Sequence, residues 1–237
     1  MVTGCPMLSS SLHRPLGELL CDATEQILWP LASGRSRGKL HCRVGHGQAT
    51  YHRYDPRQGL HQITYGVRMV EAKQQAESAA AWLSTREITR RRYFGGTVSP
   101  LNLLAHTCCH EFAHLLQQQD GKRYHGSVHN GHFYQILDNL HAQGQGNRVQ
   151  GFLAEQAQRR GLPLSDQPLR LPDPTSARAQ WRVGDKVFFG EGQSHRVGHI
   201  LRVNRKTCTV ACPALRGELR YRVPLSLLRR EEAALTA

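Results

Sequence analysis

The sequence predicts an α+β fold in two parts: a compact domain of helices and a few strands, followed by a linker and a small β-barrel. Hydrophobic residues make up 39% of the chain and charged residues 21%, as in folded soluble proteins. Residues 100–119 have the pattern of an amphipathic helix, and short strands separated by turns begin after residue 178. We therefore expect the first domain over residues 10–160, the linker over 161–178 and the barrel over 179–237.

The chain opens with a predicted helix over residues 12–32. Its leucines and isoleucine recur with an approximate helical period, and the pair Trp29–Pro30 ends the pattern. Residues 39–52 then predict either a β-hairpin or two short strands around Gly45 and Gly47. The first domain thus opens with a helix and continues into a sheet.

Residues 61–70 give the clearest strand pattern of the first domain, because Ile63, Tyr65, Val67 and Met69 alternate with polar or small residues. Residues 71–93 follow as a predicted helix. Its C-terminal half carries a cluster of arginines, which we interpret either as a solvated face or as a contact for phosphates. The cluster consists of Arg86, Arg90, Arg91 and Arg92.

A third helix is predicted from residue 100 to residue 119. Ser99 is a favourable N-cap and Pro100 suits the first helical position. The pair Asp120–Gly121 ends the helix, since Gly readily takes the left-handed conformation that follows a helix C-terminus. Apolar residues share one face, which we expect to pack on a core. They are Leu101, Leu104, Cys108, Phe112 and Leu115.

The helix contains the motif H-E-x-x-H on the face opposite those apolar residues. His110 and His114 are one turn apart, so their imidazoles can bind one zinc ion. Glu111 lies beside them and can accept a proton from water. The motif is only moderately specific, because a surface helix with two His and one Glu has the same pattern.

A catalytic zinc site needs three protein ligands and one open position, so a third ligand must follow the motif. Asp120 has a metzincin-like spacing, but that geometry needs Gly where Gln117 stands. His129 is the best candidate, because it precedes an apolar helical run and can face back across the cleft. The candidates in chain order are Asp120, His125, His129, His132 and Glu155.

The order H-E-x-x-H, an insertion, then H-x-x-x-F opening a helix resembles the SprT-like zinc metallopeptidases, which include Spartan. The matching residues here are His110, Glu111, His114, His129 and Phe133. The resemblance covers about residues 10–145 and is strong only at the motif. The family often has Gly directly after the third His, whereas this chain has Asn130 and then Gly131, so His132 stays open as an alternative to His129.

This resemblance implies a compact zincin fold, with the strand before the active helix at the sheet edge beside the cleft. An extended peptide can add to such an edge through main-chain hydrogen bonds. Zn²⁺ is the implied cofactor, and eukaryotic members cleave proteins crosslinked to DNA. The resemblance therefore implies a protein or peptide substrate and proximity to DNA.

The C-terminal third of the chain differs in pattern from the first domain. Residues 151–160 predict a polar helical segment, and the proline-rich residues 161–178 predict a linker. Short strands separated by turn signals then suggest an SH3-like or Tudor-like barrel. The run V-G-D-K-V-x-F resembles small barrels appended to some bacterial SprT-like proteins. The predicted strands are Lys186–Phe189, Arg196–Val203, Thr207–Ala211 and Arg220–Val223.

The chain is strongly basic, with a net charge of +13 and a pI near 9.9. Residues 179–237 carry 11 Lys or Arg but only 5 Asp or Glu. Such an excess favours polyanions, DNA or RNA above all, although a basic, well-solvated surface has the same composition. The candidate nucleic-acid contacts are Arg90, Arg91, Arg92, Arg202, Arg205 and Lys206.

The cysteines and the N-terminus predict a cytoplasmic, reducing location that is compatible with association with the nucleoid. Seven cysteines without a C-x-x-C pair suggest neither a disulfide framework nor a zinc ribbon. The N-terminus lacks a basic segment followed by an apolar one, and no run of 18 apolar residues occurs. We expect no membrane partner.

Together these patterns predict a zinc metalloendopeptidase that acts on proteins associated with or crosslinked to DNA. His110, His114 and His129 would hold the metal, and Glu111 would be the general base. Two other classes remain open: a nucleic-acid-binding protein with a structural zinc site, and a scaffold with a degenerate metal site. A structural site would need a fourth protein ligand.

Overall fold

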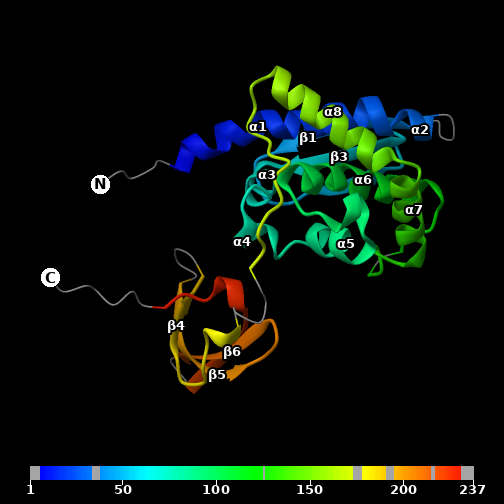
Figure 1. Cartoon of the computed structure of the whole chain (residues 1–237). Coiled ribbons are helices and arrows are strands. Elements are labelled where there is room, and N and C mark those ends of the chain that lie inside the picture. Colours follow the sequence, from blue (N-terminus) through cyan, green and yellow to red (C-terminus); the bar gives the residue numbers. More distant parts are fainter. Residues whose placement is uncertain are drawn as a thin grey trace. The chain divides into compact units, whose positions relative to one another are not determined.

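A computed structural model describes residues 6–33, 38–124, 126–172, 178–190, 195–214 and 217–230. The chain divides into two compact units, Met1–Arg170 and Leu171–Ala237. Helices dominate the first unit and an antiparallel sheet dominates the second (Figure 1). The mixture confirms the predicted α+β class.

A three-stranded sheet forms part of the first unit. Its strands are β1 (Lys39–Gly45), β2 (Tyr51–Asp55) and β3 (Leu60–Gly66), in the order β1-β3-β2. β1 runs parallel to β3 and β2 runs antiparallel to it. The hairpin expected over residues 39–52 is therefore wrong, and the alternative of two short strands is right. The loop after β1 crosses Gly66 so closely that a Cβ there would overlap the Gly47 carbonyl oxygen.

The strand predicted over residues 61–70 ends early. β3 stops at Gly66, and helix α3 (Val67–Ala72) buries Val67 and Met69 instead. The alternation of residues 63, 65, 67 and 69 does not distinguish a continued strand from a strand followed by a helix. Val67 and Val70 are about one helical turn apart, so a helix can bury both of them. β3 is the central strand, so the expectation that it forms the sheet edge is wrong. The edge strand that contacts the helix carrying the H-E-x-x-H motif is β2.

The first predicted helix is interrupted. Helix α1 (Pro6–Ala23) is followed by a π-helical turn (Thr24–Leu28) and by the short α2 (Pro30–Ser33). The buried Thr24 hydroxyl lies 2.8 Å from the Leu20 carbonyl oxygen, to which it donates, and 2.6 Å from the Tyr65 hydroxyl. A side chain bonded into the helix in this way accompanies the local widening.

The helix predicted over residues 71–93 is three short helices: the end of α3, α4 (Ala76–Ala79) and α5 (Leu83–Arg91). Side-chain hydroxyls satisfy the carbonyls at the breaks, since Ser78 donates to Ala72 O at 2.5 Å and Thr85 to Ala79 O at 2.6 Å. A 3₁₀ turn (Tyr93–Gly96) then leads towards the next helix.

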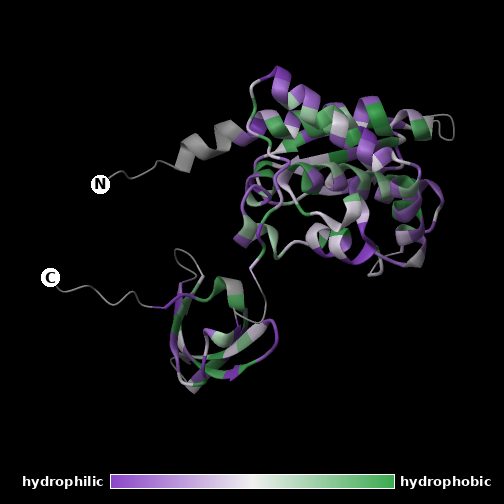
Figure 2. Ribbon diagram, in the orientation of Figure 1, coloured by the Kyte–Doolittle hydropathy of each residue, from purple (hydrophilic) through white to green (hydrophobic). Residues whose placement is uncertain are grey.

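Helix α6 (Pro100–Gln119), which carries the H-E-x-x-H motif, has the predicted bounds, and the Ser99 side chain accepts a hydrogen bond from the Asn102 amide. It runs through the middle of the first unit, between α8 (Gln145–Arg159) and α7 (Gly131–Ala142) (Figure 1). It also contacts α5 and β2. Helix α8 carries both polar and apolar residues along its length (Figure 2), as expected for a helix with one buried face.

The first half of the predicted linker is hydrogen-bonded to the first unit. The Leu101 amide donates to Ser165 O at 3.0 Å, and the Leu169 amide donates to Val98 O at 2.8 Å. The division between the units falls after Arg170, within the predicted range 161–178. The proline-rich composition predicts a connecting segment, but it does not predict which main-chain groups of that segment form hydrogen bonds with the first unit.

The second unit contains an antiparallel sheet of β4 (Lys186–Phe189), β5 (Arg196–Val203), β6 (Thr207–Ala214) and β7 (Gly217–Pro224), in that order. It covers a small core. A bridge between Phe188 and Arg229 ties the C-terminal segment to β4, but the sheet is not a closed barrel over the residues described. The core includes Trp181, Val187, Ile200, Cys208, Val210, Cys212, Val223, Leu225 and Leu228.

Candidate metal centre

Three imidazoles converge at the middle of α6. His129 Nε2 lies 3.1 Å from His110 Nε2 and 3.1 Å from His114 Nε2. Ligand nitrogens arranged as a tetrahedron around zinc, at bonds of about 2.0 Å, would be about 3.3 Å apart. Both separations from His129 are close to that value, and the ligand atoms of all three histidines lie within 4.8 Å of one another. The structure thus brings together the three histidines predicted from the sequence.

The far nitrogens of the two histidines on α6 have partners. His110 Nδ1 lies 3.0 Å from Glu87 Oε2, and His114 Nδ1 lies 3.3 Å from Gln117 Oε1. If each Nδ1 carries the proton, both Nε2 lone pairs are free for a metal ion. Burial lowers the pKa of His114 to about 3, which keeps that imidazole neutral. The donor set therefore suits a zinc ion.

Packing and hydrogen bonds fix the segment that carries His129. Phe133, on the first turn of α7, stacks on His114 at a centroid distance of 4.3 Å and contacts the His129 ring at 4.9 Å. Gln117 Nε2 donates to Val128 O at 2.9 Å and to Asn130 Oδ1 at 3.1 Å. Gln117, which excluded a metzincin-like turn in the sequence, is thus the residue that connects α6 to the third histidine.

The other candidate ligands are engaged elsewhere. His132 and Asp120 bind each other, with His132 Nε2 2.7 Å from Asp120 Oδ2. Glu155 forms an ion pair with Arg159 on the exposed side of α8. His125 lies outside the described residues. Among the described candidates, only His129 lies with the two histidines of α6.

Glu111 is buried beside these histidines and is 5% exposed. Its Oε2 has no hydrogen-bond partner among the described residues. Burial raises the pKa of the carboxyl, against the attraction of His110, Lys73 and Arg123 and the backbone N–H of His52 on β2. A buried carboxylate with one free oxygen and a raised pKa is a stronger base than one in water.

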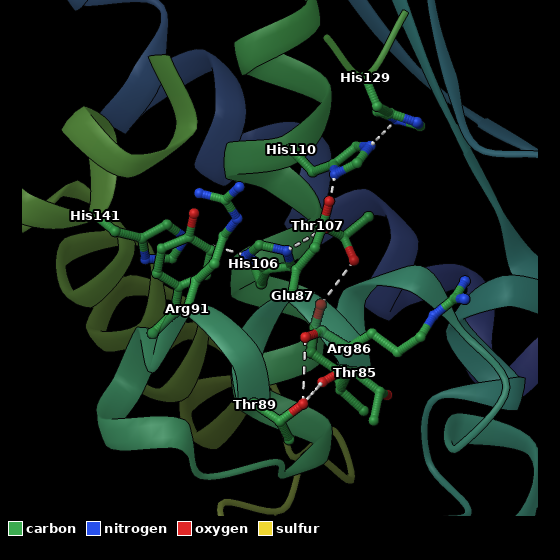
Figure 3. A network of polar contacts seen from close by, with 12 residues as sticks. Thr85, Arg86, Glu87, Thr89, Arg91, His106, Thr107, His110, His129 and His141 are labelled. Atoms are coloured by element: carbon green, nitrogen blue, oxygen red, sulfur yellow. Dashed lines mark hydrogen bonds and ion pairs between the residues drawn. The ribbon is translucent and has the colours of Figure 1, made fainter. Parts of the chain in front are cut away.

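A second cluster adjoins the first through Glu87, which sequence reasoning missed (Figure 3). Glu87 Oε2 lies 2.8 Å from His106 Nε2 as well as 3.0 Å from His110 Nδ1. His106 Nδ1 in turn lies 3.0 Å from His141 Nε2 on α7. The two histidine partners hold the pKa of Glu87 well below its usual range, although burial opposes them. Glu87 is therefore an anionic hydrogen-bond partner for a predicted ligand.

The predicted nucleic-acid contacts lie on the surface of their own units. In the first unit Arg90, Arg91 and Arg92 are exposed, and Arg91 pairs with Asp138 at 2.6 Å. In the second unit the three basic residues are exposed on β5 and on the turn that follows it. They are Arg202, Arg205 and Lys206.

Comparisons with protein-family models, with curated proteins and with solved structures found no match to this chain. The likeness to SprT-like peptidases therefore depends on the histidines, the glutamate and their spacing. Over the described residues, no helix is long and apolar enough to cross a membrane.

Proposed function

We propose that the protein is a zinc-dependent metalloendopeptidase. The observation that carries the proposal is the convergence of three imidazole Nε2 atoms beside the buried, unpartnered Oε2 of Glu111. His110, His114 and His129 would hold the ion. Zinc bound there would supply a Lewis acid that polarises a carbonyl group and acidifies water.

Glu111 performs the proton transfers in this proposal. Its Oε2 accepts a proton from the attacking water and then delivers that proton to the nitrogen of the leaving amine. Solvent and substrate enter from the side of His129, which is the exposed member of the three histidines. Glu87 and Gln117 keep the rings of His110 and His114 oriented throughout.

The edge strand β2 gives the substrate a place to bind. β2 pairs only with β3 in the described sheet, and it packs against α6. Arg123 donates to the His52 carbonyl oxygen at 3.2 Å, which ties β2 to the segment between the two zinc-site helices. An extended peptide can add to such an edge through main-chain hydrogen bonds. In this proposal the first unit is a zincin-like domain, with β2 in the role expected for residues 61–70.

We further propose that the substrates are proteins held on DNA and that the second unit, as an SH3-like module, binds the DNA. The net charge of +13 and the exposed basic residues of β5 and its turn support this proposal. A cytoplasmic, nucleoid-associated location would follow from such binding.

The direct test of the enzyme is the variant Glu111→Gln. Because Glu111 is not among the three ligands, the variant should bind zinc as the parent does but should lose hydrolysis of an unstructured protein by at least about a hundredfold. Glu155→Gln, at an exposed position of α8, is the matched control and should cleave normally. Zinc content and cleavage are measured on the same samples. Full activity in Glu111→Gln would contradict the mechanism, and zinc binding without hydrolysis in the parent would favour a structural or degenerate site.

The third ligand is tested by comparing His129→Ala with His132→Ala. The first variant should lose most of the bound zinc, because one of three ligands is removed. The second should retain it, because His132 is paired with Asp120. The opposite pair of results would show that the third ligand has been assigned to the wrong histidine.

A further inference from the structure

A small cavity of about 140 Å³ opens beside the predicted catalytic residues. Residues of α6, of α3 and the position after it, of α5 and the turn before it, and of the loop before β2 line the cavity. They are Thr50, Met69, Lys73, Trp82, Leu83, Ser84, Thr107, His110 and Glu111. An engineered cavity of about 150 Å³ holds a benzene molecule, so this one has room for a single side chain. We call it the Lys73 cavity after the lysine that lines it.

Lys73 is a buried cation with few partners. Lys73 is the residue directly after helix α3 and is 3% exposed. Its side chain donates a hydrogen bond to the Thr107 hydroxyl. Its Nζ also lies 5.2 Å from the centre of the Trp82 ring. Burial lowers the pKa of the amine to about 8, so at neutral pH it is mostly charged. No ion pair to Glu111 or to another carboxylate forms among the described residues within 4.0 Å.

Two further donors line the same cavity. The Ser84 hydroxyl has no hydrogen-bond partner in the described structure, and Ser84 is only 7% exposed. Ser84 lies in the first turn of the nine-residue helix α5, whose N-terminus has no side-chain cap. The unpaired amides of a helix N-terminus favour an anion. A buried ammonium, a buried hydroxyl and a helix N-terminus thus face one small space.

We propose that the Lys73 cavity binds a substrate carboxylate, carried by an acidic residue next to the scissile peptide bond. Met69 and Trp82 supply apolar wall for the methylene groups of such a side chain, and Lys73 and Ser84 supply donors for its oxygens. The inference deepens the proposed peptidase function and rests on it. Glu111 also lines the cavity and is acidic, so the substrate carboxylate binds to the donors of Lys73 and Ser84.

Burial of a charge without a partner is costly, and a ligand of opposite charge removes part of that cost. A Leu side chain would offer Lys73 no acceptor besides Thr107 and would offer Ser84 none. A Gln side chain would provide one acceptor oxygen without charge. The cavity should therefore favour Glu over Gln and Gln over Leu. The free C-terminal carboxylate of a short peptide has the same chemistry and is a second possible source of the group.

Binding is measured first, because it does not depend on hydrolysis. The probes are N-acetylglutamic acid amide and N-acetylglutamine amide. They are titrated into the zinc-loaded full chain, and binding is followed by calorimetry and by tryptophan fluorescence. The acid should bind at least about tenfold more tightly, as expected for a hydrogen-bonded charged group. Lys73→Met should reduce the ratio to below about twofold, and Ser84→Ala should weaken the acid severalfold. Lys39→Met, at an exposed lysine of β1, should change nothing.

Equal binding of the two probes, or a preference that survives Lys73→Met, would overturn the proposal. A preference that survives Lys73→Met is also the result expected if the acid binds directly to zinc. N-acetylleucine, whose only carboxylate is its C-terminal one, is titrated in the same way. Its affinity shows whether the cavity binds a C-terminal carboxylate as well as that of a side chain. Lys73→Met removes a buried charge, so thermal unfolding should show a fold at least as stable as the parent. Ser84→Ala remains as the deciding variant if the Met variant does not fold.

Cleavage is measured second, on blocked peptides that differ only in Glu, Gln or Leu beside the scissile bond. The kcat/KM ratio of Glu to Gln should fall by about tenfold in Lys73→Met and should stay within twofold of the parent ratio in Lys39→Met. If the parent cleaves no peptide but binds the acid through Lys73, the peptidase function fails and the carboxylate site stands. If it cleaves all three peptides equally, the peptidase function stands and the carboxylate site fails.

Discussion

At the scale of single residues, the site depends on partners that lie far from the motif in sequence. Glu87 is 23 residues from His110, on a different helix, and is buried between two histidines. A carboxylate bonded to the far nitrogen of a metal-binding histidine fixes the ring and raises its basicity. Glu87 therefore acts as a positioning residue for His110.

Glu87→Gln tests this role. The amide can keep a hydrogen bond to one ring but removes the negative charge, so zinc affinity should fall by roughly 10- to 100-fold. Glu77→Gln, at an exposed position of α4, is the matched control. Competition with a fluorescent zinc chelator gives both affinities. An unchanged affinity in Glu87→Gln would show that the hydrogen bond serves only the fold.

The motif itself could be predicted, because its chemistry is encoded by local spacing. His110, Glu111 and His114 lie one helical turn or less apart, and His129 opens the next helical run. Glu87 and Lys73 could not be predicted, because nothing in the local pattern distinguishes a buried charged residue from one on a solvated face. Tertiary packing alone places them at the site.

At the scale of elements, helices with local end signals were predicted well. α6 begins and ends where Ser99, Pro100 and Gly121 indicate. The helices expected over residues 12–32 and 71–93 are broken, because hydroxyl side chains bond to main-chain carbonyls within them. Threonine and serine have these options in any helix, and the surrounding fold decides which option is taken.

Gly66, at the junction of β3 and α3, lies directly against the loop that connects β1 and β2. A Cβ at this position would overlap main-chain atoms of the loop between β1 and β2, and main chain cannot move aside as a side chain can. Gly66→Ala should therefore lower the free energy of unfolding by about 1–3 kcal/mol. In Gly151→Ala, at an exposed position of α8, the added methyl group meets no atom within 4 Å, so this control should gain up to about 1 kcal/mol of stability. Urea denaturation measures both, and equal stabilities would contradict the close crossing.

At the scale of the whole molecule, the chain joins a unit with a histidine centre to a separate basic unit. The charge predicted a polyanion partner, but composition could not show whether the arginines were free. Arg91 is paired with Asp138, whereas Arg202, Arg205 and Lys206 are exposed. The closure of the second sheet into a barrel was expected and is not seen in the described residues.

Replacing Arg202, Arg205 and Lys206 with Gln should weaken DNA binding and lower its dependence on salt. Each lost phosphate contact should reduce the slope of log K against log salt by about 0.9. Cleavage of an unstructured peptide should stay unchanged. The control replaces Arg53, Arg57 and Arg68, which are exposed in the first unit, with Gln. If both triple variants show the same salt slope as the parent, the exposed cluster of the second unit is not the DNA contact.

The central claim is that three histidines hold a zinc ion with one position left for water. X-ray absorption at the zinc edge, with metal analysis of the same loaded protein, tests it most directly. We predict about one zinc per chain, three imidazole nitrogens at about 2.0–2.1 Å and one water oxygen. The signal should be lost in His129→Ala and kept in Glu111→Gln. A fourth protein ligand, a sulfur at about 2.3 Å or a zinc site that survives His129→Ala would contradict the account.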